Sequence, residues 1–307
     1  MSERIVTEEI PAALAGERLD RIVALIGEVS RADAAAVIEA GGVEVDRVRA
    51  ASGKVRLAAG QVVAIRLDLL PQPALPEPDG SIPLDIVHVD DDVVVVNKSP
   101  GLVVHPAAGH TGGTLVNALI ARFPEIASVG DPQRPGIVHR LDIGTSGLLV
   151  AARSARAYDA LVGALSRREV YRDYVALVWG RVEAPNGTID APIGRDPRDP
   201  MRMTVVESGK PARTHYEVRR SFDAPEVTLL DCHLETGRTH QIRVHLAAIG
   251  HPVVADATYG GRRPGVVLDR PFLHAGRLSF SHPVSGTRLE FSAPLPTDLQ
   301  VVLDRCH

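Results

Sequence analysis

The stretch PGIVHRLDIGTSGLLVAAR, residues 135–153, places a polar turn between two apolar segments. Residues 136–138 are predicted to end one strand, and the apolar run 147–152, entered through glycine, is typical of a buried strand. The turn between them carries His139, Arg140, Asp142, Thr145 and Ser146. A polar turn held by rigid strands suits a reactive group, whereas in an ordinary turn these side chains would satisfy only backbone groups. Taken alone, the local chemistry slightly favours the ordinary turn.

Length and composition narrow the class of protein. The chain has 307 residues, enough for one large domain or two unequal ones, and 45% of them are hydrophobic, as in a globular protein. No apolar run approaches the ~20 residues of a membrane span, and MSERIVTEEIPAALAG is too acidic for a signal peptide. Cys232 and Cys306 form neither a disulfide framework nor a cysteine zinc site. We therefore expect a cytoplasmic protein without a membrane partner.

The charge is unevenly distributed along the chain. The formal net charge is -4, but residues 132–220 hold 15 lysines and arginines against 10 aspartates and glutamates, a local net of +5. The rest of the chain therefore sums to -9. An excess of positive charge around the polar turn is the direction expected for a site that faces phosphates. Chance clustering on a solvated surface is the alternative.

A proline-rich segment divides the chain into two predicted domains. Residues 66–84 contain five prolines, which indicates a semi-rigid linker over residues 69–82. Residues 1–68 before it predict a small αβ domain, with helices over 18–26 and over 31–39 after the N-cap Ser30, and strands over 43–46 and 61–65. Residues 83–307 form the predicted large domain.

The large domain is predicted to be mainly antiparallel sheet with few helices, an α+β fold. A hairpin is expected over 85–89 and 93–98, and further strands over 171–182 and much of 203–235. Two helices stand out: one over 155–165 capped by Ser154, and one over 240–249 capped by Thr239 and ended by Gly250.

Two further stretches carry polar groups in a suggestive context. In LETGRTHQIRVHLAAIGHPVVAD, residues 234–256, Arg238 and Arg243 flank a helix start, which predicts an anion site. Its target is either an RNA phosphate or a carboxylate of the protein. In YRDYVALVWG, residues 171–180, strand alternation places Tyr174 beside the apolar core positions, where an isolated tyrosine is usually structural.

Several common sites are missing from the sequence. It contains no glycine-rich nucleotide loop and no serine-hydrolase elbow. His240 and His245 are five residues apart, which is unsuitable for two zinc ligands on one helix face. His105, His139 and His274 have no matching cluster and are expected to be structural. We therefore expect neither a metal nor a cofactor.

The order of these motifs resembles that of one known family. HRLD followed by TSG, a tyrosine at the start of a strand ending in glycine, and then TGRTHQIRVH resembles the RluA-type pseudouridine synthases over residues 85–295. VVVVNKSPGLVVHP at 93–106 and GKPARTHYEV at 209–218 fit as well, and ERLDRIVALIGEVSR resembles an S4 RNA-binding domain. The resemblance implies a monomeric, cofactor-free isomerase that converts uridine to pseudouridine in RNA, most closely in 23S ribosomal RNA.

The resemblance also implies roles for individual residues. Asp142 corresponds to the catalytic aspartate, Tyr174 to the tyrosine that stacks near the target base, and Arg243 to the arginine that pairs with the aspartate. Substrate-binding roles are implied for His139, Arg140, Thr145, Arg238 and Ile242. A flipped nucleotide leaves a space in the RNA stack that His139 and Arg140 are expected to fill.

Two features of the sequence depart from the family pattern. Ile143-Gly144 replaces a more usual charged pair, and residues 1–65 carry eight basic against ten acidic residues, so the small domain is expected to bind RNA weakly. A non-catalytic RNA-folding factor and an aspartate-based nucleoside or glycoside hydrolase are the alternatives. The hydrolase would need a second carboxylate, for which no motif is evident.

Overall fold

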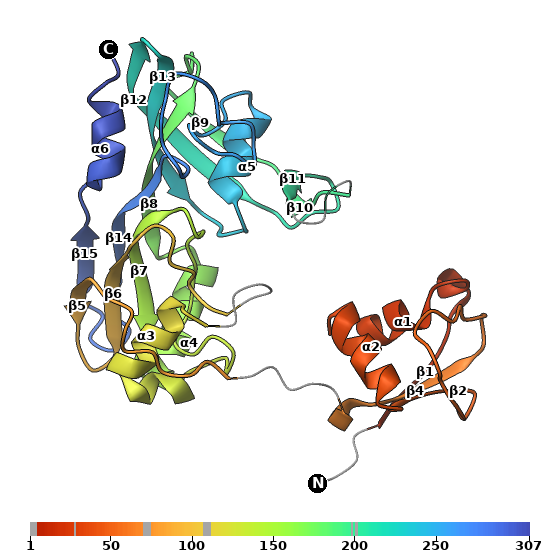
Figure 1. Cartoon of the computed structure of the whole chain (residues 1–307). Coiled ribbons are helices and arrows are strands. Elements are labelled where there is room, and N and C mark those ends of the chain that lie inside the picture. The colour runs from red at the N-terminus through yellow and green to blue at the C-terminus, as the bar shows by residue number, and fades with distance from the viewer. Residues whose placement is uncertain (1–4, 28, 70–74, 107–111, 198, 200–201) are drawn as a thin grey trace. The chain divides into compact units, whose positions relative to one another are not determined.

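The computed structural model describes residues 5–307 except for residues 28, 70–74, 107–111, 198 and 200–201. The chain forms two compact units, Met1–Ala74 and Leu75–His307 (Figure 1). The boundary falls in the proline-rich segment. Residues 70–74 of the predicted linker lie outside the described residues, and residues 75–82 belong to the second unit.

The first unit packs two helices on a small antiparallel sheet. The strand order is β1-β4-β2-β3. Its elements are β1 (Ile5–Glu9), the short 3-10 turn η1 (Ala12–Leu14), α1 (Leu19–Ile26), α2 (Arg31–Glu39), β2 (Val43–Val45), β3 (Val48–Arg49), β4 (Val62–Arg66) and the 3-10 turn η2 (Leu67–Leu69). The predicted helices and strands are confirmed. The Ser30 hydroxyl accepts the Asp33 N–H at 3.1 Å, which caps α2 as expected.

One nine-stranded sheet organises the second unit. Its order is β5-β6-β7-β14-β8-β13-β12-β9, with β15 paired to β14. All of these strand pairs are antiparallel except β7 with β14. The strands are β5 (Ile86–Val89), β6 (Val93–Lys98), β7 (Ser146–Ala152), β8 (Tyr171–Trp179), β9 (Asn186–Asp190), β12 (Arg213–Asp223), β13 (Glu226–Leu234), β14 (Leu273–Ser281) and β15 (Arg288–Ser292). The predicted α+β fold with a mainly antiparallel sheet is confirmed.

Four α-helices accompany this sheet in the described part of the second unit. They are α3 (Leu115–Arg122), α4 (Ala155–Ser166), α5 (Gln241–Ala248) and α6 (Thr297–Leu303); the short elements are η3 (Pro124–Ser128) and the pair β10 (Ile193–Arg195) and β11 (Met203–Val205). Ser154 caps α4 as predicted. Helices α3 and α6 were not predicted. Nowhere in the described chain is a helix both long and apolar enough to span a membrane.

The strand that follows the polar turn is a central part of the core. Every residue of β7 is buried, which confirms the predicted strand. The prediction that a strand ends at residues 136–138 is wrong. That segment forms no strand and makes only an isolated bridge from Ile137 to Ala151. Gly147 has a φ of +116°, and a Cβ there would lie 2.3 Å from the Ala275 carbonyl oxygen. The close parallel contact of β7 with β14 therefore requires glycine.

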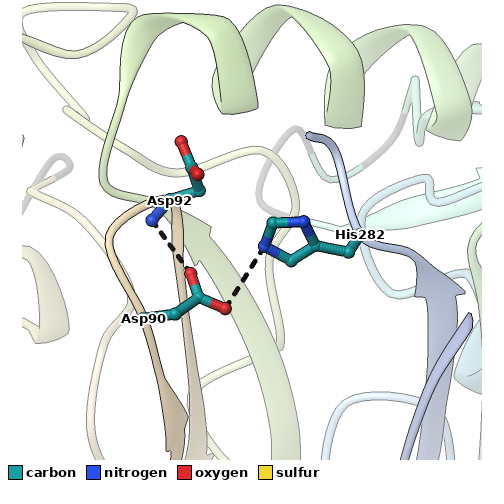
Figure 2. A group of neighbouring side chains, drawn as sticks. All are labelled: Asp90, Asp92 and His282. Carbon is teal, nitrogen blue, oxygen red and sulfur yellow. Dashed lines mark hydrogen bonds and ion pairs between the residues drawn. The ribbon is translucent and has the colours of Figure 1, made fainter. Parts of the chain in front are cut away.

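A polar cluster holds the turn between β5 and β6. We call it the corner cluster and define it as His88, Asp90, Asp92, Ser154, Arg156 and His282. Asp90 accepts hydrogen bonds from the backbone N–H groups of Asp92 and Val93 at 2.9 and 2.8 Å and faces His282 at 3.3 Å (Figure 2). Asp92 accepts from the Ser154 hydroxyl at 2.6 Å and from Arg156 at 2.8 and 3.0 Å. The start of α4 is thereby tied to the hairpin.

Candidate functional site

A cavity of about 640 Å³ lies in the second unit, lined by the polar turn, β8 and the start of α5. Seven of the eight predicted site residues line it: His139, Arg140, Asp142, Thr145, Tyr174, Arg238 and Ile242. The eighth, Arg243, donates a hydrogen bond from Nη1 to Oδ2 of Asp142 across 3.1 Å. Residues more than a hundred positions apart in the sequence are thus brought to one place.

Arg243 bridges two carboxylates. Its Nε and Nη2 donate to the two oxygens of Asp256 at 2.6 and 2.9 Å, which leaves Nη1 for Asp142. Asp256 is fully buried and also accepts the backbone N–H groups of Thr258 and Tyr259. This two-point contact fixes the plane of the guanidinium. Asp256 therefore orients the group that in turn orients Asp142.

The electrostatics of Arg243 follow from this arrangement. Burial by itself lowers the pKa of Arg243, but the hydrogen bonds and charges of Asp256 and Asp142 raise that pKa above its ordinary value. The guanidinium is therefore permanently charged. This one cation faces two carboxylates, and Asp142 is the one of the pair that is partly exposed at the cavity.

The start of α5 differs from the prediction. The N-cap is His240, which has a φ of 59°, and Thr239 lies outside the helix, so the predicted Thr239 cap is wrong. Nδ1 of His240 is 2.8 Å from the Tyr259 hydroxyl, and the Tyr259 ring centroid lies 5.0 Å from the Arg243 guanidinium carbon. A histidine in the left-handed region is uncommon. Arg243 contacts protein carboxylates, which are one of the two predicted targets of this anion site.

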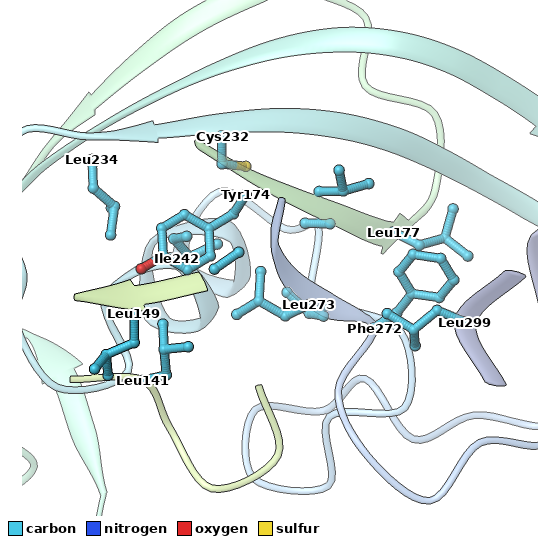
Figure 3. Close-up of a cluster of buried hydrophobic side chains, with 14 of the residues drawn as sticks. Leu141, Leu149, Tyr174, Leu177, Cys232, Leu234, Ile242, Phe272, Leu273 and Leu299 are labelled. Atoms are coloured by element: carbon cyan, nitrogen blue, oxygen red, sulfur yellow. The ribbon is translucent and has the colours of Figure 1, made fainter. Parts of the chain in front are cut away.

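Tyr174 belongs to the core and to the cavity at once. It is 5% exposed and packs with Leu234 and Ile242 (Figure 3). Burial raises the pKa of Tyr174 to about 12, so its hydroxyl stays protonated at neutral pH. A rigid aromatic ring beside Asp142 can stack on a planar base.

A buried lysine supports the polar turn from behind. Lys98, 2% exposed, donates from Nζ to the carbonyls of Ser99 at 2.8 Å, Leu102 at 3.0 Å and Ile143 at 3.4 Å. Burial lowers the pKa of Lys98 to about 7, and the charge of Asp142 opposes this shift. The sequence interpretation missed Lys98. The sequence did contain a signal for a buried lysine, because Lys98 ends an apolar strand directly before Ser-Pro-Gly.

Arginine dominates the charge of the cavity. Five arginines line it against two acidic residues, Asp142 and Glu235; the arginines are Arg134, Arg140, Arg168, Arg172 and Arg238. Arg140 is exposed, and in the part of the chain that the structure describes its side chain makes no hydrogen bond or ion pair. Arg238 donates from Nε to the Pro211 carbonyl at 3.0 Å. Such a lining attracts polyanions.

The described residues contain one group with the spacing of a metal site. Asp90, Asp92 and His282 of the corner cluster offer ligand atoms within 4.8 Å of one another (Figure 2). Both oxygens of Asp92 are already taken by Arg156, whose guanidinium supplies the positive charge. None of the three lines the cavity. We interpret the group as structural.

Comparison with known proteins assigns the chain to a family. Residues 92–248 match the family described as RNA pseudouridylate synthase. A protein of Chloroflexus aurantiacus described as an uncharacterized RNA pseudouridine synthase is 51% identical, covering 98% of this chain and 93% of its own. The ribosomal large subunit pseudouridine synthase D of Xanthomonas campestris is 44% identical over 95% of this chain and 89% of its own.

The solved structures agree with these sequence matches. Human RNA pseudouridylate synthase domain containing 1 superposes with a TM-score of 0.56 at 32% identity, covering 72% of this chain and 86% of its own. The predicted resemblance is thus confirmed for the family, although the roles of single residues stay predictions. This chain belongs to the RNA pseudouridine synthase family and is an isomerase of that class.

Proposed function

We propose that this synthase isomerises uridines in the RNA of the large ribosomal subunit, with Asp142 as its catalytic carboxylate and without a cofactor. The observation that carries the proposal is the chain of contacts Asp142–Arg243–Asp256 at the cavity. It holds the Asp142 carboxylate in place next to a space lined by arginine. The large-subunit target is supported by relatives with that name, 40–44% identical over most of this chain.

The reaction needs few groups. The C1′–N1 bond of uridine breaks, the base rotates, and a C1′–C5 bond forms, while the proton on C5 moves to N1. Atoms and electrons balance without an oxidant or a metal. A carboxylate at the sugar can act as a nucleophile or as a base. Asp142 has one oxygen held by Arg243, which leaves the other for this step.

The second carboxylate argues for isomerisation over hydrolysis. A typical glycosidase uses two carboxylates on opposite sides of the bond it cleaves. Asp256 is close to Asp142 through Arg243, but its oxygens are occupied by Arg243 and two backbone N–H groups. It is therefore unavailable as the acid or base that a hydrolase requires.

The remaining candidates surround the position of the base. We assign Tyr174 to stacking on the target uracil and Ile242 to the wall of its pocket, because both border the cavity from the core. Exposed Arg140 is assigned to the RNA stack that the flipped nucleotide vacates. Thr145 and Arg238 complete the substrate-binding set as cavity-lining donors.

The direct test is to incubate the protein with unmodified 23S ribosomal RNA and map uridine isomers. The buffer contains EDTA and enough monovalent salt to keep the RNA folded. Pseudouridine at defined positions supports the proposal. Release of free uracil would identify a hydrolase, binding without any change would identify a folding factor, and a rate restored only by zinc would refute cofactor-free catalysis.

We also propose that the first unit is an S4-like domain that selects the modified position and adds little affinity. The positive excess lies in residues 132–220, whereas residues 1–65 are net acidic. A protein of residues 75–307, the whole second unit, should then keep most of the salt dependence of RNA binding and lose preference for the correct site in long RNA. A salt dependence that collapses on truncation would refute this division of roles.

A further inference from the structure

Unpaired polar atoms gather at the cavity. Among the described residues, four side chains that line it each have a buried polar atom without a hydrogen-bond partner: His105 Nδ1, His139 Nδ1, Thr145 Oγ1 and Arg172 Nε. Buried polar atoms in native proteins are nearly always paired. A group of unpaired ones around a single cavity therefore indicates where a ligand supplies the partners.

Arg172 is the unusual member of this group. It lies on β8 and is 6% exposed, yet its guanidinium makes one long hydrogen bond, from Nη2 to the Leu234 carbonyl at 3.4 Å. No described carboxylate pairs with it. Burial lowers the pKa of Arg172, as expected for a cation without a counter-charge. Gly237 leaves room for the group, because a Cβ there would come within 2.9 Å of Nη1.

His139 adds a neutral donor beside this charge. Its Nε2 accepts the Val150 N–H at 3.1 Å, so in the neutral ring the proton must be on Nδ1. Burial, and then the charge of Arg172, lowers the pKa of His139 to about 3, so the ring is neutral at pH 7. The Nδ1–H group is consequently an unpaired donor, and its ring cannot turn without losing the contact with β7.

We propose that Arg172 and the Nδ1–H group of His139 form a phosphate subsite that binds the phosphodiester next to the target nucleotide. The inference rests on the proposed function and names the part of the RNA that this side of the cavity holds. A phosphodiester carries one negative charge and two free oxygens, which match one guanidinium and one neutral donor. A uracil carbonyl could accept from these donors, but it is uncharged and would not neutralise the buried guanidinium of Arg172.

The test combines a protein change with a chemical change in the RNA. The RNA is a 23S ribosomal hairpin that the protein binds, made with its normal backbone or with a neutral methylphosphonate at one linkage flanking the target. Full-length protein carrying Asp142→Asn, with or without Arg172→Gln, is titrated against each. We expect Arg172→Gln to weaken binding of the normal hairpin about tenfold. At one linkage the methylphosphonate should cause a similar loss that does not add to the loss in the variant.

Two further variants keep the test decisive. Arg172→Lys retains the charge and should restore most of the sensitivity to the methylphosphonate, which a folding defect would not do. Arg122→Gln is the matched control, because Arg122 lies over the Phe123 ring at 5.2 Å, does not line the cavity and falls outside the positively charged segment 132–220. Losses that multiply at every linkage, or unchanged binding by Arg172→Gln, would overturn the subsite. Failure of the proposed function is distinguishable, because the wild type would then make no pseudouridine whatever the binding pattern.

Discussion

The corner cluster and the cavity both gather polar side chains in the second unit, and they differ in how completely their buried polar atoms are hydrogen-bonded. In the corner cluster, none of the buried side-chain atoms that the structure describes lacks a partner. At the cavity, Asp142, Arg243 and Asp256 are paired, while Nε of Arg172 and Nδ1 of His139 have no partner among the described residues. Both groups contain carboxylates and arginines, so composition alone does not separate them.

The difference separates stability from function. A fully paired polar network stabilises the fold, whereas one with open donors carries an energetic cost that a ligand removes. Changes in the corner cluster should therefore lower stability and leave activity per folded molecule intact. Changes at Arg172 or His139, where donors lack partners, should lower activity and leave stability nearly unchanged. A change at Arg243 should affect both stability and activity, because Arg243 is fully paired and also positions Asp142.

The largest effect is expected for Arg243→Met. It leaves the buried Asp256 with only two backbone N–H donors and the partly exposed Asp142 without its cation, which costs about 3–5 kcal/mol of unfolding free energy, and it should also abolish isomerisation. Urea denaturation measures the first effect and pseudouridine formation the second. A double-mutant cycle with Asp142→Asn should show strong coupling in stability. Additive losses would mean that Arg243 and Asp142 do not interact.

Asp142→Asn should affect activity alone. We expect at least a thousandfold loss of turnover, roughly 4 kcal/mol in the barrier, because the amide can neither attack the sugar nor remove a proton. The unfolding free energy should stay within about 1 kcal/mol of wild type, since asparagine can still accept from Arg243. Turnover within tenfold of wild type would exclude Asp142 as the catalyst.

Asp92→Asn in the corner cluster makes the same chemical change as Asp142→Asn but should lower stability and leave activity unchanged. Asparagine loses the charge that faces Arg156 and one of the two hydrogen bonds that Arg156 donates, so we expect a loss of about 1–2 kcal/mol in stability. Activity of the folded fraction should be unchanged. The two assays run on one preparation decide the outcome. A loss of activity at temperatures where the variant is fully folded would break the distinction between the two clusters.

The last comparison is a difference in the pH dependence of the unfolding free energy. The pKa of His139 is lowered to about 3 in the folded protein, so the unfolded chain takes up the proton first. Its contribution to stability is complete above pH 6.5 and is lost as the pH falls, by at most about 1.4 kcal/mol per pH unit. Urea denaturation at pH 7, 6 and 5 should show a smaller loss in His139→Gln than in wild type.

The corner cluster provides the contrast in the same experiment. The hydrogen bond from Arg156 and then that from Ser154 lower the pKa of Asp92 below its ordinary 3.8, so its contribution is lost only at more acidic pH. Between pH 5 and 7 an Asp92→Asn variant should therefore run parallel to wild type. Equal slopes for wild type and His139→Gln would show that His139 is not held neutral by the fold.

Local signals in the sequence predicted much of this architecture. Three predictions depended only on residues close together in the sequence, and all three are confirmed. They are the buried strand β7 and the serine caps of α2 and α4. The Thr239 cap failed because His240 adopts a left-handed conformation and forms the cap position itself. A contact of its ring with Tyr259, nineteen residues further on, accompanies that conformation and is invisible to local rules.

The site was predictable where a family motif marked it and not where partners come from elsewhere in the chain. The motifs pointed to Asp142, Tyr174 and Arg243, which the structure brings together. Asp256 ends the same quoted stretch, but nothing local to it indicates that it holds Arg243. Arg172 lies two residues from Tyr174 and went unnoticed, because an exposed arginine and an uncompensated buried one look alike in sequence.

The position of β14 has a consequence for how the protein is made. This strand lies between β7 and β8, although it is synthesised after every other strand of the sheet except β15. Until residues 273–281 leave the ribosome, the segments on either side of that gap have no common partner. Chains fold from the N-terminus as they emerge, and long-range pairings form late. A nascent chain therefore cannot assemble the cavity, and cannot become active, before residues 273–281 have emerged.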